Sequence, residues 1–216
     1  MINYKKAQKI LLNSKIKIKN EIILPNNAIN RVSATNIYSP VNYPAGNNTA
    51  FDGFAINSKE TNGLSATNIK KFKILKTLAA GDNPKIKNIK KYSAIEVMTG
   101  ALISKPFDTV IPVEAINFYP DKKNPKSIII NKKIPKNNYI RFFGSDYKKS
   151  EKIISSGEII NSSHILAFKS LGVNKIIVKK KPIIMFYSTG NEISEKINVP
   201  DWKVRNSNSH YIRSLS

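Results

Sequence analysis

Three acidic residues of this chain stand on three separate glycine-containing turns. Asp52 lies in AFDGFAI (50–56), Asp146 in FFGSD (142–146) and Glu192 in YSTGNE (187–192). Hydroxyl groups and further glycines accompany them, at Thr99 and Gly100 in MTGA (98–101) and at Ser188, Thr189 and Gly190 just before Glu192. Turns of this kind place polar side chains and free backbone N–H groups where a ligand can reach them.

These residue types suit one chemistry in particular. Carboxylate oxygens are preferred ligands of hard cations such as Mg²⁺, which often bridge to substrate phosphates, and hydroxyl and backbone N–H groups bind phosphates and oxyanions. We interpret Asp52, Asp146 and Glu192 as candidate catalytic and metal-binding residues of a Mg²⁺-assisted site for a phosphorylated anion. The alternative for each acid is a carboxylate that caps its own turn, and the sequence alone does not show that the three meet in space.

The stretch NYPAGNNTAFDGFAI (42–56) must position the first of these acids. Pro44 fixes its own φ and favours extended geometry at Tyr43. An Asp-Gly pair is a common hairpin turn, because Gly tolerates positive φ. We therefore expect Asp52 and Gly53 to form a tight turn that the flanking Phe51 and Phe54 anchor to a core.

The middle of the chain has the pattern of a β-rich region. Short apolar or alternating segments at 71–78, 92–98, 108–116 and 127–131 predict strands, separated by Pro, Asn and Gly. Pro112 inside the third of them indicates an edge strand or a bulge. These strands predict a small barrel or sandwich, as a β-rich insert over about 42–138.

Mixed elements surround this insert. We expect a helix over 3–13, strands at 21–24 and 34–38, a helical turn or two within 27–32, and strand-like residues before a turn at Gly157. Ser162 and Ser163 predict the start of a helix that ends before Gly172, with His164 as a surface or capping residue. A strand is expected at 173–178.

The continuously apolar run PIIMFYS (182–188) has a different character. It is typical of a strand buried on both faces of a parallel sheet, with STGNE at its carboxyl end, where ligands bind in doubly wound folds. We predict an α+β protein with two parts: residues 1–181, and residues 182–216 as the first βα unit of an incomplete, truncated α/β doubly wound domain.

Composition limits the classes of function. The 216 residues carry a net charge of +22, but Lys greatly exceeds Arg and accompanies heavy use of Ile and Asn, as an AT-rich coding sequence would produce. A basic nucleic-acid-binding protein is the alternative; scarce Arg and the lack of an RNA-binding signature argue against it. There is no cysteine and no apolar run near the roughly 20 residues of a membrane span. A cytoplasmic protein without membrane contact is expected.

Several collinear motifs resemble the molybdopterin molybdenumtransferases, the MoeA and gephyrin E-domain family. YPAGNNTAFDGFAI (43–56) resembles that family's P-x-x-x-N-S-A-M-D-G-Y-A signature, EVMTGA (96–101) its I-M-T-G-A and DTVIPVEAI (108–116) its A-V-V-P-x-E segment. IRFFGSD (140–146) is similar to I-R-x-x-G-E-D, and SLGVNKIIVKKKPIIMFYSTGNEI (170–193) is similar to the segment that ends in S-T-G-D-E-L.

The resemblance implies an activity in molybdenum cofactor biosynthesis. The family inserts molybdate into adenylylated molybdopterin with Mg²⁺ and releases AMP. By this resemblance Asp52, Asp146 and Glu192 serve metal, molybdate and phosphate positioning, and Thr99 and Gly100 contact the substrate. The resemblance also implies a homodimer whose active site is shared between two chains, and a molybdopterin adenylyltransferase as a partner.

The chain departs from the family pattern at several positions. Asn191 replaces an Asp, Ser145 replaces the Glu of G-E-D, and Asn206 to Asn208 stand where relatives read Y-D-T-N. The resemblance also covers only the N-terminal half of the family's length. The chain alone is therefore expected to be incomplete as a catalyst, and a non-catalytic dimerisation or scaffold module is the alternative within the same family.

Overall fold

The computed structural model describes residues 2–14 and 16–215. The chain forms two compact units, one of residues 21–178 and one that combines residues 1–20 with 179–216. The predicted boundary after residue 181 and the predicted insert over 42–138 stay predictions.

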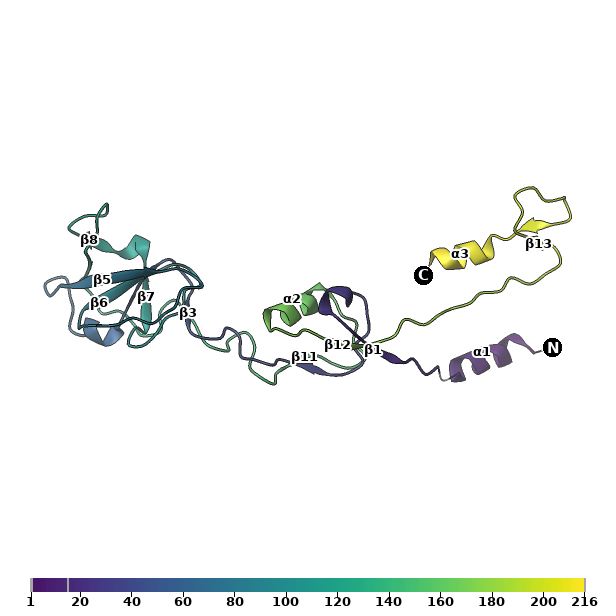
Figure 1. Ribbon diagram of the computed structural model, residues 1–216, viewed down its shortest axis with the longest axis horizontal. Helices are drawn as coiled ribbons and strands as arrows, with labels where there is room; N and C mark the ends of the chain where they lie inside the picture. The colour runs from purple at the N-terminus through teal and green to yellow at the C-terminus, as the bar shows by residue number, and fades with distance from the viewer. Residues whose placement is uncertain (1, 15, 216) are drawn as a thin grey trace. The chain divides into compact units, whose positions relative to one another are not determined.

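A curled six-stranded sheet forms the β-rich part of the first unit (Figure 1). Its strands are β4 (Gly53–Ile56), β5 (Lys70–Leu78), β6 (Ser93–Val97), β7 (Thr109–Pro112), β8 (Asn117–Tyr119) and β9 (Ser127–Ile130), in the order β7-β4-β6-β5-β9-β8. Only β5 and β6 run parallel to each other; the other neighbours are antiparallel. The 3₁₀ turns η2 (Ser58–Thr61) and η3 (Val113–Ala115) follow β4 and β7.

The predicted strands at 71–78, 92–98, 108–116 and 127–131 are confirmed as β5, β6, β7 and β9. Pro112 ends β7, which is an edge strand, as the sequence predicted. The edge explains why Pro is tolerated there, since a proline cannot donate a hydrogen bond to a further strand.

Strand β4 lies inside the sheet and is buried along its whole length. Phe54 and Ile56 join one apolar cluster with Phe72, and Ala55 joins a second cluster with Ile95. Because successive side chains of a strand point to opposite faces, β4 contributes to a core on each side of the sheet.

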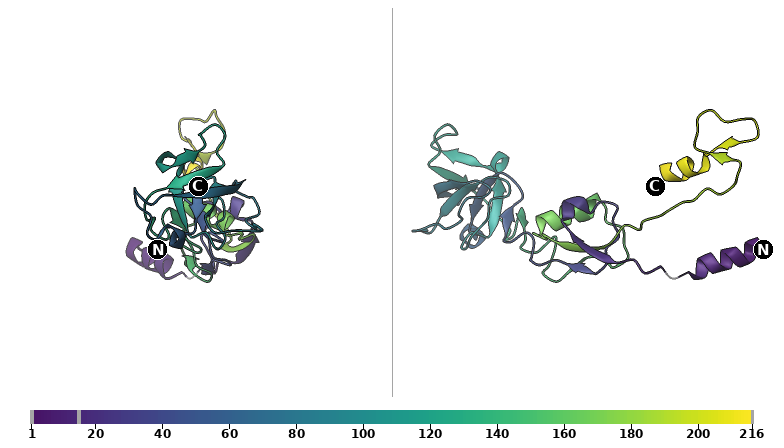
Figure 2. Two further views of the ribbon diagram at one scale, coloured as in Figure 1. Left: turned by 90° about the vertical axis from the view of Figure 1, so that its left-hand side faces the viewer. Right: turned by 45° about the vertical axis from the view of Figure 1, so that its right-hand side comes forward.

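Short paired segments and one helix make up the rest of this unit (Figure 2). The strands are β1 (Asn20–Ile23) with β12 (Ile176–Lys179), β2 (Ile37–Tyr38) with β11 (Lys152–Ile154), and β3 (Asn48–Thr49) with β10 (Ile140–Arg141). A third apolar cluster joins Ala28, Ile154, Phe168 and Val178, so that helix α2 (Ser162–Ser170) packs on these strands. The helical turn expected within 27–32 lies earlier, as η1 (Pro25–Asn27).

The residue that caps helix α2 is Asn161, one residue before the predicted cap at Ser162 and Ser163. The Asn161 side chain accepts from the His164 N–H (3.1 Å), and His164 Nδ1 accepts from the Asn161 N–H (3.2 Å). This reciprocal pair satisfies two N–H groups at the helix start and confirms His164 as a capping residue. Gly172 follows the helix with a φ of 74°, as expected for the residue after a helix.

The second unit contains helix α1 (Tyr4–Asn13), the parallel pair β13 (Ile193–Ser194) and β14 (Val204–Arg205), and helix α3 (Asn208–Ser214). Helix α1 confirms the prediction for residues 3–13. The strand predicted at 182–188 was wrong: the segment has no regular structure, and Ile183 is 87% exposed. A strand needs backbone partners, and no described strand pairs with this segment. No described helix is long and apolar enough to cross a membrane.

Candidate functional site

The sheet brings Asp52 and Thr99 together from positions 47 residues apart. Asp52 directly precedes β4 and Thr99 follows β6, and these strands are antiparallel with Gly53 opposite Val97. Asp52 Oδ1 accepts hydrogen bonds from the Thr99 N–H (2.6 Å) and from Thr99 Oγ1 (2.7 Å). The strand register therefore fixes two of the predicted site residues next to each other.

Gly53 has a different role from the predicted one. It does not form a hairpin turn but begins β4, and its φ is not positive. A Cβ at this position would lie 2.1 Å from the backbone oxygen of Ile111 on the neighbouring β7. Gly53 is thus required by the close approach of two strands, and this approach places Asp52 at the sheet end. Of the flanking aromatics, Phe54 is buried and Phe51 packs edge-on against Tyr139.

The turn after β6 presents Thr99 to Asp52. Gly100 has a φ of 86°, and its N–H donates to the Thr49 oxygen (3.0 Å). The Ala101 N–H closes the turn on the oxygen of Met98 (2.9 Å). Glycine suits Gly100 because this left-handed conformation costs other residues energy. Thr99 and Gly100 therefore have defined positions, as a turn that contacts a ligand requires.

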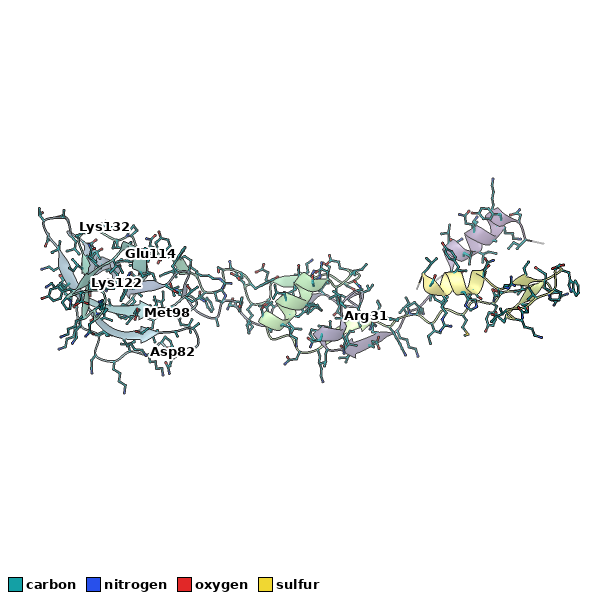
Figure 3. The ribbon with its side chains drawn as sticks, turned by 90° about the horizontal axis from the view of Figure 1, so that it is seen from above. Arg31, Asp82, Met98, Glu114, Lys122 and Lys132 are labelled. Atoms are coloured by element: carbon teal, nitrogen blue, oxygen red, sulfur yellow. The ribbon has the colours of Figure 1, made fainter. Side chains whose placement is uncertain are left out.

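A second turn, residues 79–82 after β5, lies at the same end of the sheet. Because β5 runs parallel to β6 and Leu78 pairs with Val97, this turn lies near the turn that follows β6. Here Asp82 Oδ2 accepts from the Ala79 N–H (2.8 Å), so this acid caps its own turn. Figure 3 labels Asp82 and Met98, which mark the two turns.

The environment of Asp52 favours its ionised form. The Thr99 hydroxyl, and next the Thr99 N–H, hold the pKa of Asp52 below its ordinary value, and slight desolvation opposes them. The side chain is exposed, and among the described residues no hydrogen bond reaches its Oδ2. One oxygen is thus held in place while the other is available to a ligand.

Replacing Thr99 by valine is expected to raise the pKa of Asp52 toward its ordinary value without reaching it. The hydroxyl, which is the larger cause of the shift, is lost, whereas the backbone N–H remains. Because the folded pKa is depressed, the stabilising bond is present above the ordinary pKa and lost as pH falls through the folded pKa. In the variant this loss occurs at a higher pH. An NMR titration of the Asp52 carboxyl carbon measures both values; equal pKa values in the two proteins would contradict the assigned role of Thr99.

Asp146 is engaged differently. Arg141 contacts it twice, through Nη2 to Oδ2 and through Nε to Oδ1 (3.3 Å), and Ser145 Oγ donates to Oδ1 (3.0 Å). The Arg141 guanidinium holds the pKa of Asp146 below its ordinary value. Arg141 also lies over the Tyr43 ring, 5.6 Å from its centre. Unlike Asp52, this carboxylate has both oxygens committed to other side chains.

Arg141 is a partner that the sequence analysis missed. It stands five residues before Asp146 in IRFFGSD (140–146), so the motif itself contained the signal. Asparagines hold the same loop from the 42–47 segment: Asn47 Oδ1 accepts from the Phe143 N–H (2.8 Å) and Asn42 Oδ1 from the Lys149 N–H (2.9 Å). These contacts explain why the turn before β4 and the loop after β10 have defined geometry.

Glu192 and its neighbours lie in the other unit. Gly190 has a φ of 139°, and a Cβ there would lie 2.4 Å from Glu192 Oε1. Ser188 Oγ donates to Asn206 Oδ1 (2.9 Å), and both residues line a cavity of about 310 Å³ that also contacts Gly190. Thr189 is exposed. Among the described residues, no group of three or more His, Cys, Asp or Glu side chains is placed to hold a metal ion.

Known proteins resemble this chain over most of its length. Residues 2–172 match the family described as MoeA N-terminal region (domain I and II). A molybdopterin molybdenumtransferase of Staphylococcus epidermidis is 29% identical over 216 residues, which is all of this chain and 50% of that protein. One of Staphylococcus aureus strain Mu50 is 30% identical over 190 residues, 88% of this chain and 44% of that protein. The chain thus spans about half the length of the relatives it matches.

Solved structures give the same result. A molybdopterin biosynthesis MoeA protein from Pyrococcus horikoshii superposes with a TM-score of 0.83 at 25% identity, over 98% of this chain and 53% of that structure. A second structure, a molybdopterin biosynthesis MoeA protein from Pyrococcus horikoshii OT3, gives a TM-score of 0.81 at 28% identity, over 100% of this chain and 56% of that structure. These matches confirm the predicted β-rich α+β fold.

Proposed function

Because this chain belongs to the family of MoeA N-terminal regions, we propose that it supplies the N-terminal part of a molybdopterin molybdenumtransferase in molybdenum cofactor biosynthesis. The family resemblance inferred from the motifs is thereby confirmed. The proposed reaction is the insertion of molybdate into adenylylated molybdopterin with release of AMP. The relatives named molybdopterin molybdenumtransferase support this proposal.

The hydrogen-bonded pair of Asp52 and Thr99 is the observation that carries the proposal. Thr99 orients the carboxylate and favours its ionised form, while Oδ2 has no hydrogen-bond partner among the described residues. A fixed anionic oxygen at an exposed sheet end can bind a cation that neutralises a phosphate or molybdate. We propose that Thr99 and Gly100, in the turn beside Asp52, contact this substrate.

Mg²⁺ is compatible with this arrangement. It keeps several waters and is usually bound by one or two carboxylates together with substrate phosphates. Asp52 offers one oxygen of this kind. We propose Asp52 as the Mg²⁺ ligand of this region, with Asp146 and Glu192 as the other candidates. Bound Mg²⁺ would neutralise charge on the phosphates.

We also propose a homodimer in which two chains share the active site. Exposed apolar side chains support an assembly: Ile183, Ile184 and Met185 are 87%, 77% and 73% exposed and consecutive in the chain. Exposed apolar side chains that gather on a surface can be covered by another chain. A molybdopterin adenylyltransferase partner and a cytoplasmic location belong to the same proposal.

An AMP-release assay tests the proposed function. Native protein that contains residues 1–216 is mixed with adenylylated molybdopterin, with molybdate and Mg²⁺ each added or withheld. We expect AMP release only when both are present, because the substrate phosphates, the cation and molybdate must meet at one site. Equal rates of AMP release with and without molybdate would contradict the proposal. A dimer by size measurement that releases no AMP would instead favour the scaffold module.

A further inference from the structure

Six lysines line one cavity of about 560 Å³ in the β-rich part, next to strand β5 and the loop of residues 83–92. These residues, Lys73, Lys76, Lys85, Lys87, Lys90 and Lys91, define what we call the lysine cavity. Ser93, the first residue of β6, also lines it. Asp52 and Thr99 lie beyond the other end of β6, so the lysine cavity is separate from the candidate site above.

An irregularity in β5 lets two of its lysines reach the cavity. The pairing of β5 with β6 shifts register between Ile74 and Thr77. In a regular strand, Lys73 and Lys76 would point to opposite faces. The irregularity breaks this alternation, and Lys73, Leu75 and Lys76 all line the cavity.

The loop on the other side is anchored at several points. Ile86 and Ile89 are partly buried against the apolar cluster that contains Leu78. The Pro84 oxygen accepts from Ser104 Oγ (2.9 Å), and the Tyr92 N–H donates to Glu60 Oε2 (2.7 Å). Ile86 and Ile89 stand between lysines in KIKNIKK (85–91), so that partly burying the isoleucines leaves the lysines exposed at the cavity.

The lysine cavity has no compensating charge. No acidic residue lines it, and no ion pair to its lysines occurs in residues 2–14 and 16–215. The acids on neighbouring elements are engaged elsewhere: Glu96 accepts from Thr77 Oγ1 (2.5 Å) and Glu60 from the Tyr92 N–H. Six like charges repel one another, and a bound anion would relieve that repulsion.

Coding bias does not by itself account for this density. Lys and Arg make up 36 of 216 residues in the chain, about one in six, but lysines make up four of the seven residues 85–91. The four converge with two lysines of β5 on one cavity. A scattered compositional excess of Lys does not predict that convergence.

We propose that the lysine cavity binds a small ligand that carries two or more consecutive phosphate groups. Its volume lies within the roughly 300–1,000 Å³ of small-molecule sites, and lysine ammonium groups bind phosphates as point charges. Leu75 and Ile86 add apolar lining for the rest of the ligand. A nucleoside triphosphate and free tripolyphosphate share this chemistry.

A polynucleotide fits these observations less well. Sequence-independent binding of single strands relies on aromatic rings on which bases stack. No aromatic side chain lines the lysine cavity. Tyr92, which precedes the lining residue Ser93, packs edge-on against Phe72, 5.4 Å between ring centres.

Calorimetric titration with tripolyphosphate, ATP and adenosine tests the proposal. We expect one site per chain for tripolyphosphate and ATP and none for adenosine. ATP binding tighter than tripolyphosphate identifies a nucleotide site, and the reverse order identifies a site for the phosphates alone; both support the shared chemistry. The triple variant Lys73→Ala, Lys76→Ala, Lys87→Ala should raise Kd about tenfold, as the summed loss of three exposed ionic contacts.

Two matched variants separate the cavity from the general positive field. The triple Lys122→Ala, Lys123→Ala, Lys132→Ala removes the same charge from exposed positions outside the cavity, two of which Figure 3 labels. The triple Lys73→Arg, Lys76→Arg, Lys87→Arg keeps the cavity charge. Both should bind within about twofold of the native protein. Equal losses in the two alanine triples, or tighter binding of single-stranded DNA or RNA than of ATP, would overturn the proposal.

Discussion

Replacing Gly53 by alanine is expected to destabilise the β-rich sheet by about 3 kcal/mol or more. The added Cβ would lie 2.1 Å from the backbone oxygen of Ile111 and 3.0 Å from Cα of Pro112. The clash involves backbone atoms, and β4 is paired on both sides, with β6 and β7. Moving β4 and β7 apart to relieve the clash would therefore break backbone hydrogen bonds between paired strands. Urea unfolding followed by circular dichroism measures the loss.

Gly157→Ala is the matched control for that measurement. Gly157 has a φ of 89°, but a Cβ there would meet no atom within 4 Å. This substitution should cost only the strain of a left-handed residue, about 1–2 kcal/mol. If Gly53→Ala proved no more harmful than Gly157→Ala, the close approach of β4 and β7 would not be what selects glycine at position 53.

Replacing Asp52 by asparagine is expected to reduce molybdate-dependent AMP release by about 100-fold or more while leaving the fold intact. The expected size follows from mutations that remove one group stabilising transition-state charge. The amide oxygen of the new side chain could still accept from Thr99, so the exposed turn should remain, but the charge that would hold a cation is lost. The assay is AMP release by the native protein and the variant at equal concentration, with thermal unfolding measured in parallel.

The other end of β4 offers a close control. Asp108, which precedes β7, accepts from the Ser58 N–H at Oδ1 (2.7 Å) and from Ser58 Oγ at Oδ2 (3.0 Å), so its carboxylate is also held by the N–H and the hydroxyl of one residue. Asp108→Asn should cost about 1 kcal/mol of stability and leave the rate of AMP release unchanged. Equal rates for the Asp52 variant and the native protein would remove Asp52 from the proposed mechanism.

The sequence predicted those elements whose signal is local. The first part of strand β5 alternates polar and apolar residues over 71–74, the turn at Gly157 lies where it was expected, and α2 begins within one residue of the predicted cap. The family motifs contain both Asp52 and Thr99, and the structure places these two residues in contact. The motifs do not predict the register of β4 against β6, and this register brings Asp52 and Thr99 into contact.

The errors have a common physical cause, which is dependence on distant partners. Gly53 had the signature of a hairpin turn, but its requirement comes from Ile111, 58 residues later, and no local pattern shows it. The run at 182–188 has the composition of a buried strand, but it has no paired strand among the described residues. The contacts of Asp146 with Arg141 and Ser145 likewise depend on how the loop folds, and the metal-binding role expected for Asp146 stays a prediction.

The burial of β4 on both faces has a consequence for how faithfully the protein assembles. Slipping β4 by one residue would exchange Phe54 and Ile56 with Ala55 between the two apolar clusters, since side chains alternate in a strand. The same slip would move Asp52 away from Thr99, because Gly53 would no longer lie opposite Val97. Molecules with a misplaced carboxylate would therefore also have badly filled cores, and they would be the ones that unfold and are degraded. The register that fills both apolar clusters is therefore the same register that places Asp52 beside Thr99.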